Sequence, residues 1–311
     1  MLTKQILEIY ELLDRADASG DLLKSHFESL GANDVIVKEI GENGNTTDFI
    51  RVRIPGTQGK VRGGDMPTLG ILGRLGGVGA RPEMIGFVSD GDGALAALAA
   101  AAKILDMQSK GDFLAGDVIV CTDIDPQAPT QPHDPVPFMG STVDMDIINR
   151  ESVTEDIDAI LCIDTTKGNR IINHNGFAIS PTVKEGYILR VSDALLNIAQ
   201  IVSGKMPRVF AISQQDITPY GNDLYHINSI MQPCTVTNAP LVGVAITTEV
   251  MVPGCATGAS HCQDVEGAAR FAVEVAKSFG RGECLFYDER EYALILEKYG
   301  DMKRFQSKGM N

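Results

Sequence analysis

The stretch that decides the fold begins with TLGIL (residues 68–72) and continues through SDGDG (89–93), ALAALAAAAKIL (94–105) and VIVCT (118–122). The first and last of these segments are short and apolar, which is typical of buried strands. The alanine-rich segment between them has a high intrinsic helix propensity. The stretch therefore predicts a buried strand, a helix that opens at an Asp-Gly loop, and a second buried strand.

The same alternation continues on both sides of this stretch. Two amphipathic helices open the chain at residues 2–13 and 22–30, before the first strands. Continuously apolar strands that alternate with helices indicate a mainly parallel sheet covered on both faces, so the predicted fold is α/β, a three-layer α/β/α sandwich. The other predicted strands are 34–40, 49–54, 159–163, 188–191, 208–213 and 241–247, and the other predicted helices are 146–153, 194–202, 224–231 and 265–279.

Length and composition limit the class of protein. The chain has 311 residues, of which 44% are hydrophobic and 22% charged, and this profile excludes collagen-like and wholly disordered chains. No internal boundary interrupts the pattern. We therefore expect a single domain over residues 1–311, with a core over about 7–280, a C-terminal extension over 281–311 and no inserted dimerisation domain.

The charge balance restricts the partners. The 27 basic and 41 acidic residues give a net charge of −14, which disfavours nucleic acid and anionic membranes. The longest apolar run, residues 94–102, is much shorter than the roughly 20 residues that span a bilayer, and the N-terminus lacks the features of a secretion signal. The 6 cysteines include no C-x-x-C pair, so we expect reduced thiols, a cytoplasmic location and a small-molecule partner. The sequence leaves open whether the chain forms a homo-oligomer.

Acidic side chains and one histidine follow the predicted strands at their carboxyl ends. Ligands of parallel α/β sheets bind outside these ends. Each residue alone is also compatible with a helix cap or a solvated loop. Together, the carboxylates need a counter-ion or raised pKa values, and carboxylate with imidazole suits Zn, Mn or Fe. The candidate metal ligands are Asp90, Asp92, Asp123, Asp125, Asp164 and His261.

Short motifs occur in a suggestive order along the chain. They are ASGD (18–21), GENGN (41–45), TLGILG (68–73), the Asp-Gly loop (89–93), DID (123–125), GS (140–141), Asp164, GND (221–223) and SH (260–261). This order resembles that of the co-catalytic zinc aminopeptidases and deacylases, and in particular a bacterial domain family of unknown function related to them. The resemblance covers about residues 7–279 and implies an α/β/α exopeptidase fold.

Two departures from that family affect the implied chemistry. Where the family has His-x-Asp after the third strand, with the histidine on the first metal, this chain has Arg74, Leu75 and Gly76. Where the family has a Glu-Glu pair, this chain has Asp123 and Asp125, and strand alternation would point both to one side. A normal two-metal hydrolase is therefore not expected.

The ligands that the resemblance implies can be counted for each metal. The first site keeps Asp90, or else Asp92, and Asp164, and we expect Arg74 to replace its metal by pairing with Asp164 or Asp90. The second site keeps Asp90, one of the two aspartates of residues 123–125, and His261. Three protein ligands and an open position are the arrangement of a catalytic zinc, so the sequence predicts at most one zinc or other divalent metal.

Two functions compete. A hydrolase of small amide or peptide substrates would use one metal to polarise the carbonyl, Asp123 or Asp125 to take the proton, and Arg74 to hold a substrate carboxylate or the oxyanion. A non-catalytic relative would bind a small ligand in the same cleft, and the lost His-x-Asp favours it. A nucleotide-binding function is weaker, because no Walker lysine is present.

Other polar residues complete the predicted site. His133 lies in a proline-rich loop after the second strand of the opening stretch and is a candidate proton shuttle or substitute ligand. We expect the substrate pocket to include Tyr220, Asn222, Asp223 and His226.

Overall fold

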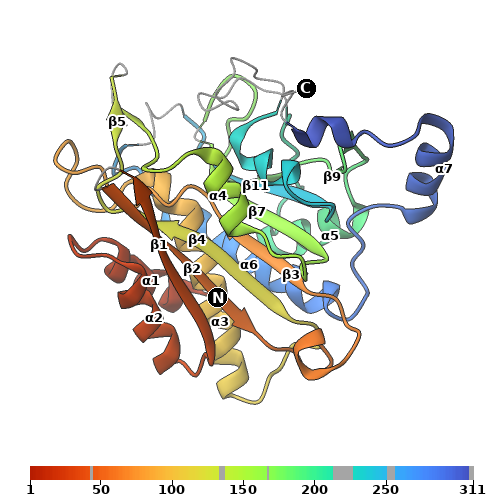
Figure 1. Ribbon diagram of the computed structural model, residues 1–311, viewed down its shortest axis with the longest axis horizontal. Helices are drawn as coiled ribbons and strands as arrows, with labels where there is room; N and C mark the ends of the chain where they lie inside the picture. Colours follow the sequence, from red (N-terminus) through yellow and green to blue (C-terminus); the bar gives the residue numbers. More distant parts are fainter. Residues whose placement is uncertain (43–44, 133–136, 167, 213–226, 251–255, 308–311) are drawn as a thin grey trace.

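The computed structural model describes residues 1–311 except 43–44, 133–136, 167, 213–226, 251–255 and 308–311 (Figure 1). The strands are β1 (Asp34–Glu42), β2 (Asn45–Ile54), β3 (Leu69–Gly73), β4 (Val118–Ile124), β5 (Thr130–Gln131), β6 (Phe138–Met139), β7 (Ala159–Thr165), β8 (Gly176–Ile179), β9 (Val183–Lys184), β10 (Tyr187–Ile188) and β11 (Leu241–Thr247). The α-helices are α1 (Thr3–Leu13), α2 (Gly20–Ser29), α3 (Asp92–Ser109), α4 (Met145–Ser152), α5 (Asp193–Ser203), α6 (Cys262–Phe279) and α7 (Glu289–Tyr299). Short 3₁₀ helices are η1 (Lys60–Arg62), η2 (Ser89–Gly91), η3 (Ser229–Thr235) and η4 (Lys303–Ser307).

A nine-stranded sheet forms the centre of the protein, in the order β1-β2-β4-β3-β7-β11-β9-β10, with β8 also paired to β11. Its central strands β4, β3, β7 and β11 run parallel to one another. The outer strands β1, β2, β8, β9 and β10 pair antiparallel. The carboxyl ends of the four central strands therefore lie along one edge of the sheet.

Helices cover both faces of this sheet, because alternate residues of each central strand point to opposite sides. On β3, Leu69 and Ile71 pack in an apolar cluster with α1, α2, α3, α5 and α6, whereas Leu72 packs in a second cluster with Met231 of η3. Helix α4 contacts β2 and β4 and lies beside η3 (Figure 1). The predicted α/β class with a mainly parallel central sheet is confirmed.

Helix α3 is buried over most of its length, and its alanines explain how this is possible. It contacts the sheet on one side and α1 and α6 on the other. The residues from Ala94 to Ala102 are at most 1% exposed. Methyl side chains allow such close approach from both sides, and they cost little entropy when the helix forms.

Helix α7 projects from the body of the protein beside the hairpin of β9 and β10 (Figure 1). Polar contacts hold it there: the Tyr292 hydroxyl donates to Glu185 Oε2 at 2.7 Å, and the Tyr187 hydroxyl donates to Gly300 O at 2.6 Å. Helix α7 was not predicted from the sequence, although residues 292–296 form an apolar run, of which only Tyr292 is buried.

Several predicted elements are wrong or incomplete. Strand 188–191 is wrong beyond Ile188, where the short β10 ends. Of the predicted strand 208–213, residues 208–212 form only one bridge, between Val209 and Ile179, and residue 213 lies outside the described ranges. Phe210 and Ile212 are nevertheless buried, so their apolar pattern marked a covering segment and not a strand. Of the predicted helix 224–231, the last residues belong to the 3₁₀ helix η3, and residues 224–226 lie outside the described ranges.

No helix within the described ranges has both the length and the apolar character that crossing a membrane requires.

Candidate functional site

Three charged side chains lie at neighbouring strand ends on the same face of the sheet. Leu72 of β3 is in register with Cys121 of β4 and with Cys162 of β7. Since residues two apart on a strand share a face, Arg74, Asp123 and Asp164 follow on the face that carries the second apolar cluster. The Arg74 amide donates to Ile163 O at 2.8 Å and so extends the pairing of β3 with β7 past the end of the strand.

The Arg74 guanidinium is buried, with 1% of the residue exposed. Its Nη1 donates to Asn149 Oδ1 at 2.9 Å and its Nη2 lies 3.9 Å from Met145 Sδ, while Nε has no hydrogen-bond partner among the described residues. Both partners belong to α4. Arg74 forms no ion pair with any acidic side chain in the described part of the chain, so the expected pairing with Asp164 or Asp90 is wrong. Helix α4 supplies a neutral amide in place of a carboxylate.

Asp123 is the carboxylate that the charge of Arg74 influences. It is 4% exposed, and burial raises the pKa of its carboxyl to about 6, against the opposing effect of Arg74 and with a further upward contribution from Asp125. A carboxyl with a pKa near 6 can both accept and release a proton close to neutral pH. Such a pKa makes Asp123 a candidate for general acid–base chemistry.

The surroundings of Asp125 differ from those of Asp123, although the two residues are only two positions apart in the chain. Its carboxylate accepts hydrogen bonds from the Thr142 hydroxyl and from the Gln127 amide, the latter at 3.1 Å. Burial raises the pKa of its carboxyl, and the negative charge of Asp48 raises it further. Asp125 lines a pocket of about 570 Å³ whose lining includes Asp48 but not Asp123. The two aspartates therefore have different surroundings, although the charge of Asp125 still raises the pKa of Asp123.

Asp90 and Asp92 lie where η2 passes into α3, and both are buried. The Ser260 hydroxyl hydrogen-bonds the Asp92 carboxylate, which ties the start of α3 to the segment before α6. The chain is crowded here: a Cβ atom on Gly93 would lie 2.1 Å from Arg74 O and 2.4 Å from Ile163 O. Glycine at position 93 thus lets α3 begin directly against the ends of β3 and β7.

Asp164 and His261 occupy contrasting positions. Asp164 is 5% exposed, and its Oδ1 accepts the Thr165 amide at 2.7 Å. The His261 side chain is 51% exposed, and its Nδ1 lies 3.4 Å from Asp264 Oδ2, on the first turn of α6.

The predicted metal set does not form within the described ranges. No three histidine, cysteine, aspartate or glutamate side chains of the described residues are grouped closely enough to hold a metal ion. The set of Asp90, either Asp123 or Asp125, and His261 therefore does not fit a metal as these residues are placed. The predicted site residues His133, Tyr220, Asn222, Asp223 and His226 lie outside the described residues.

Sequence reasoning missed the residues that hold Arg74. Asn149 is fully buried, and it lies four residues after Met145, so the two share one face of α4. An asparagine on the apolar face of a predicted helix was the available signal, since a buried amide requires a polar partner. The identity of that partner depended on how α4 packs.

Comparisons with known proteins support the fold. The bottromycin maturation enzyme BotP, solved in complex with Mn, is 10% identical with a TM-score of 0.51, over 89% of this chain and 71% of that one. The leucine aminopeptidase of Caenorhabditis elegans is 13% identical with a TM-score of 0.51, over 89% of this chain and 66% of that one. These likenesses confirm the exopeptidase-like fold expected from the order of motifs.

No curated protein matches the chain in sequence. The family model described as "Protein of unknown function (DUF1177)" matches residues 38–309. The chain therefore belongs to that family.

Proposed function

We propose that this protein is a hydrolase of small amide or peptide substrates that acts at the ends of β3 and β4, with Asp123 as the proton-transferring group. The observation that carries the proposal is the proximity of buried Asp123, whose carboxyl has a pKa of about 6, to the charge of buried Arg74, which forms no ion pair with an acidic side chain of the described residues. The fold likeness to BotP and to a leucine aminopeptidase is compatible with this class of reaction.

The two side chains have separate tasks in the proposed reaction. Above pH 6 the Asp123 carboxylate accepts a proton from the attacking water, and it then delivers that proton to the nitrogen of the leaving amine. The guanidinium of Arg74 stays charged throughout and has free donor capacity at Nε, so it can stabilise the oxyanion or hold a substrate carboxylate. Asn149 fixes the guanidinium in place.

We assign no step to a metal, because the expected ligands are not grouped among the described residues. The resemblance to zinc enzymes nevertheless makes metal content a useful test. We expect untagged protein, dialysed against excess Zn²⁺ and then against buffer, to retain at most one equivalent by elemental analysis. Two tightly bound equivalents would contradict this expectation.

A second candidate function is binding of a small ligand without turnover. It is favoured by the chemistry at position 74, where a fixed cation held by Asn149 and Met145 stands in place of a metal-binding histidine. In this case Arg74 would recognise a carboxylate of the ligand, and Asp123 would balance the buried charge.

One experiment separates the two candidates. Wild-type protein, Asp123→Asn and the control Asp112→Asn, which changes an exposed aspartate, are assayed against dipeptides and N-acyl amino acids from pH 4.5 to 8. A hydrolase is expected to lose activity below about pH 6 and to lose about 10²-fold or more in Asp123→Asn, with the control unchanged. Substrates that bind by calorimetry without turnover would support the binding function. Turnover that is equal in all three proteins would contradict the role of Asp123.

We also propose a cytoplasmic location. The five described cysteines are free thiols and four of them are buried, which is compatible with a reducing compartment. Its proposed partner is a small molecule. Light scattering of the purified protein would determine whether it is a homo-oligomer.

A further inference from the structure

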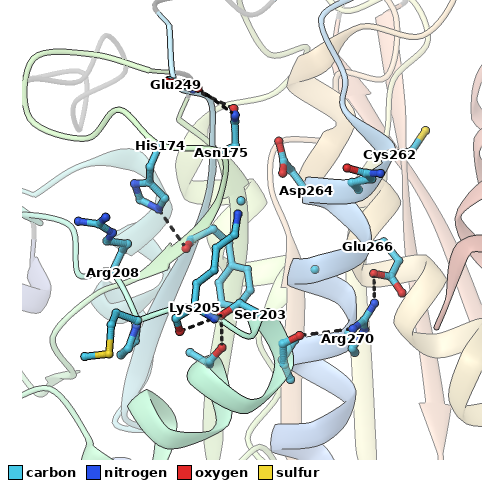
Figure 2. Close-up of a pocket in the computed structure, with 18 of the residues that line it drawn as sticks. His174, Asn175, Ser203, Lys205, Arg208, Glu249, Cys262, Asp264, Glu266 and Arg270 are labelled. Atoms are coloured by element: carbon cyan, nitrogen blue, oxygen red, sulfur yellow. Dashed lines mark hydrogen bonds and ion pairs between the residues drawn. The ribbon is translucent and has the colours of Figure 1, made fainter.

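A groove of about 1030 Å³ lies between α6 and the end of α5 with the segment before β8 (Figure 2). Its lining includes none of Arg74, Asp123 and Asp164, which together form the strand-end site. One wall carries His174 and Arg208, and the other wall is α6 with Asp264, Glu266 and Arg270 (Figure 2). Lys205 also lines the groove. The volume is sufficient for a metabolite-sized ligand.

The acidic side chains of this groove are already engaged. Glu266 accepts the Leu2 amide at 2.7 Å and forms an ion pair with Arg270. Glu249 accepts from the Asn175 side-chain amide at 3.2 Å, and Asp264 faces His261. The negative charges therefore have local partners, and Arg270 has one as well.

The two remaining cations of the groove, Lys205 and Arg208, have no acidic partner among the described residues. Both residues are exposed. Their charges act on the ring of His174: burial lowers the pKa of the imidazole, and the charges of Arg208 and Lys205 lower it further. The contact with Phe177 O and the charge of Asp264 oppose this lowering. The His174 ring is held by Phe177 O, 3.3 Å from Nε2, which leaves Nδ1 for another contact.

We propose that this groove binds a small ligand through an oxyanion group, phosphate or carboxylate, held by Lys205 and Arg208 beside His174. A guanidinium offers two parallel donors to such a group, and an ammonium adds a point charge. Two exposed cations that line the same groove as a histidine, and that form no ion pair with an acidic side chain of the described residues, are a specific feature in a chain whose net charge is −14. The proposal is independent of the hydrolase function.

The test titrates the full-length protein with inorganic phosphate and, separately, with succinate by calorimetry at constant ionic strength. The key variant is Lys205→Ala/Arg208→Ala, which removes two exposed side chains and should fold normally. The matched control is Arg62→Ala/Lys298→Ala, which makes the same change in net charge at exposed positions outside the groove. NMR titration of the His174 ring gives a second readout, because a bound anion should raise the pKa of the imidazole.

We expect saturable binding of at least one anion, a Kd that rises about tenfold or more in the groove variant, and a Kd unchanged in the control. We also expect the anion-induced rise in the His174 pKa to disappear in the groove variant. Binding of phosphate alone would identify a phosphate-bearing ligand, and binding of succinate a carboxylate-bearing one. The proposal is overturned if neither anion binds saturably, or if the groove variant binds as tightly as the control.

Discussion

The strand-end site and the groove beside α6 both contain an arginine without an acidic partner among the described residues, yet the two arginines differ in burial. Arg74 is 1% exposed and is held by two residues of α4, whereas Arg208 is exposed on the wall of the groove. A buried charge affects folding directly, because its solvation must be replaced by protein groups. An exposed charge remains solvated and contributes mainly when a ligand binds. Burial thus decides whether an unpaired cation acts on stability or on recognition.

The largest effect is expected from Arg74→Ala. This change removes the cation next to buried Asp123, leaves Asn149 Oδ1 without its donor and opens a cavity, so the free energy of unfolding should fall by about 3 kcal/mol or more. Urea denaturation of Arg74→Ala and of Arg208→Ala measures the contrast. Arg208→Ala should lower the free energy of unfolding by less than about 0.5 kcal/mol. Equal losses in the two variants would contradict the proposed difference between the buried and the exposed arginine.

A change in pH should alter the free energy of unfolding by a comparable amount, through the titration of Asp123. Its folded-state pKa of about 6 lies above the unfolded value, so between about pH 4 and 6 the unfolded chain loses its proton first and stability falls as pH rises. The loss attributable to this group should approach about 3 kcal/mol above pH 6 and be absent below pH 4. Urea denaturation across this range should show the decline in the wild type and a smaller one in Asp123→Asn. Parallel profiles would contradict the raised pKa.

Asn149→Ala tests whether the hydrogen bond from Arg74 to Asn149 stabilises the fold. Removing the amide leaves the Arg74 Nη1 donor unsatisfied in the interior, at a cost of about 1–3 kcal/mol. Asn197→Ala is a suitable control, because it changes an exposed asparagine of α5. If thermal unfolding shows no difference between the two variants, the Arg74–Asn149 contact does not stabilise the fold.

The smallest effect is expected in the groove. Without added anion, Lys205→Ala/Arg208→Ala should match the wild type in stability, because both side chains are exposed. With phosphate at tenfold its Kd, linkage predicts about 1.4 kcal/mol of stabilisation for the wild type and less for the variant. Thermal shift measurements with and without phosphate check this. Stabilisation of both proteins to the same extent would place the anion elsewhere.

Much of the strand-end site could be predicted from local pattern. Continuous apolar runs marked β3, β4, β7 and β11, and acidic residues after two of these runs correctly indicated charges at one edge of the sheet. The short strands β8 and β9 were missed, and β10 was predicted only at Ile188, because two to four residues carry too little pattern to distinguish a strand from a loop. The division of the chain into domains and the role of each site residue remain predictions.

By itself, the sequence determined the α/β fold, the exopeptidase-like order of motifs and the placement of Arg74, Asp123 and Asp164 at strand ends. These follow from periodicity, which reports the face that each residue occupies on its own element. Only the tertiary structure decided that Arg74 bonds to Asn149 and not to a carboxylate, that His261 faces Asp264 at the surface, and that Lys205 and Arg208 share a groove with α6. The Arg74–Asn149 contact and the groove join segments far apart in the chain, and which of them meet depends on how helices and loops pack against the sheet. His261 and Asp264 are only three residues apart, but the exposure of the His261 side chain likewise depends on how α6 packs.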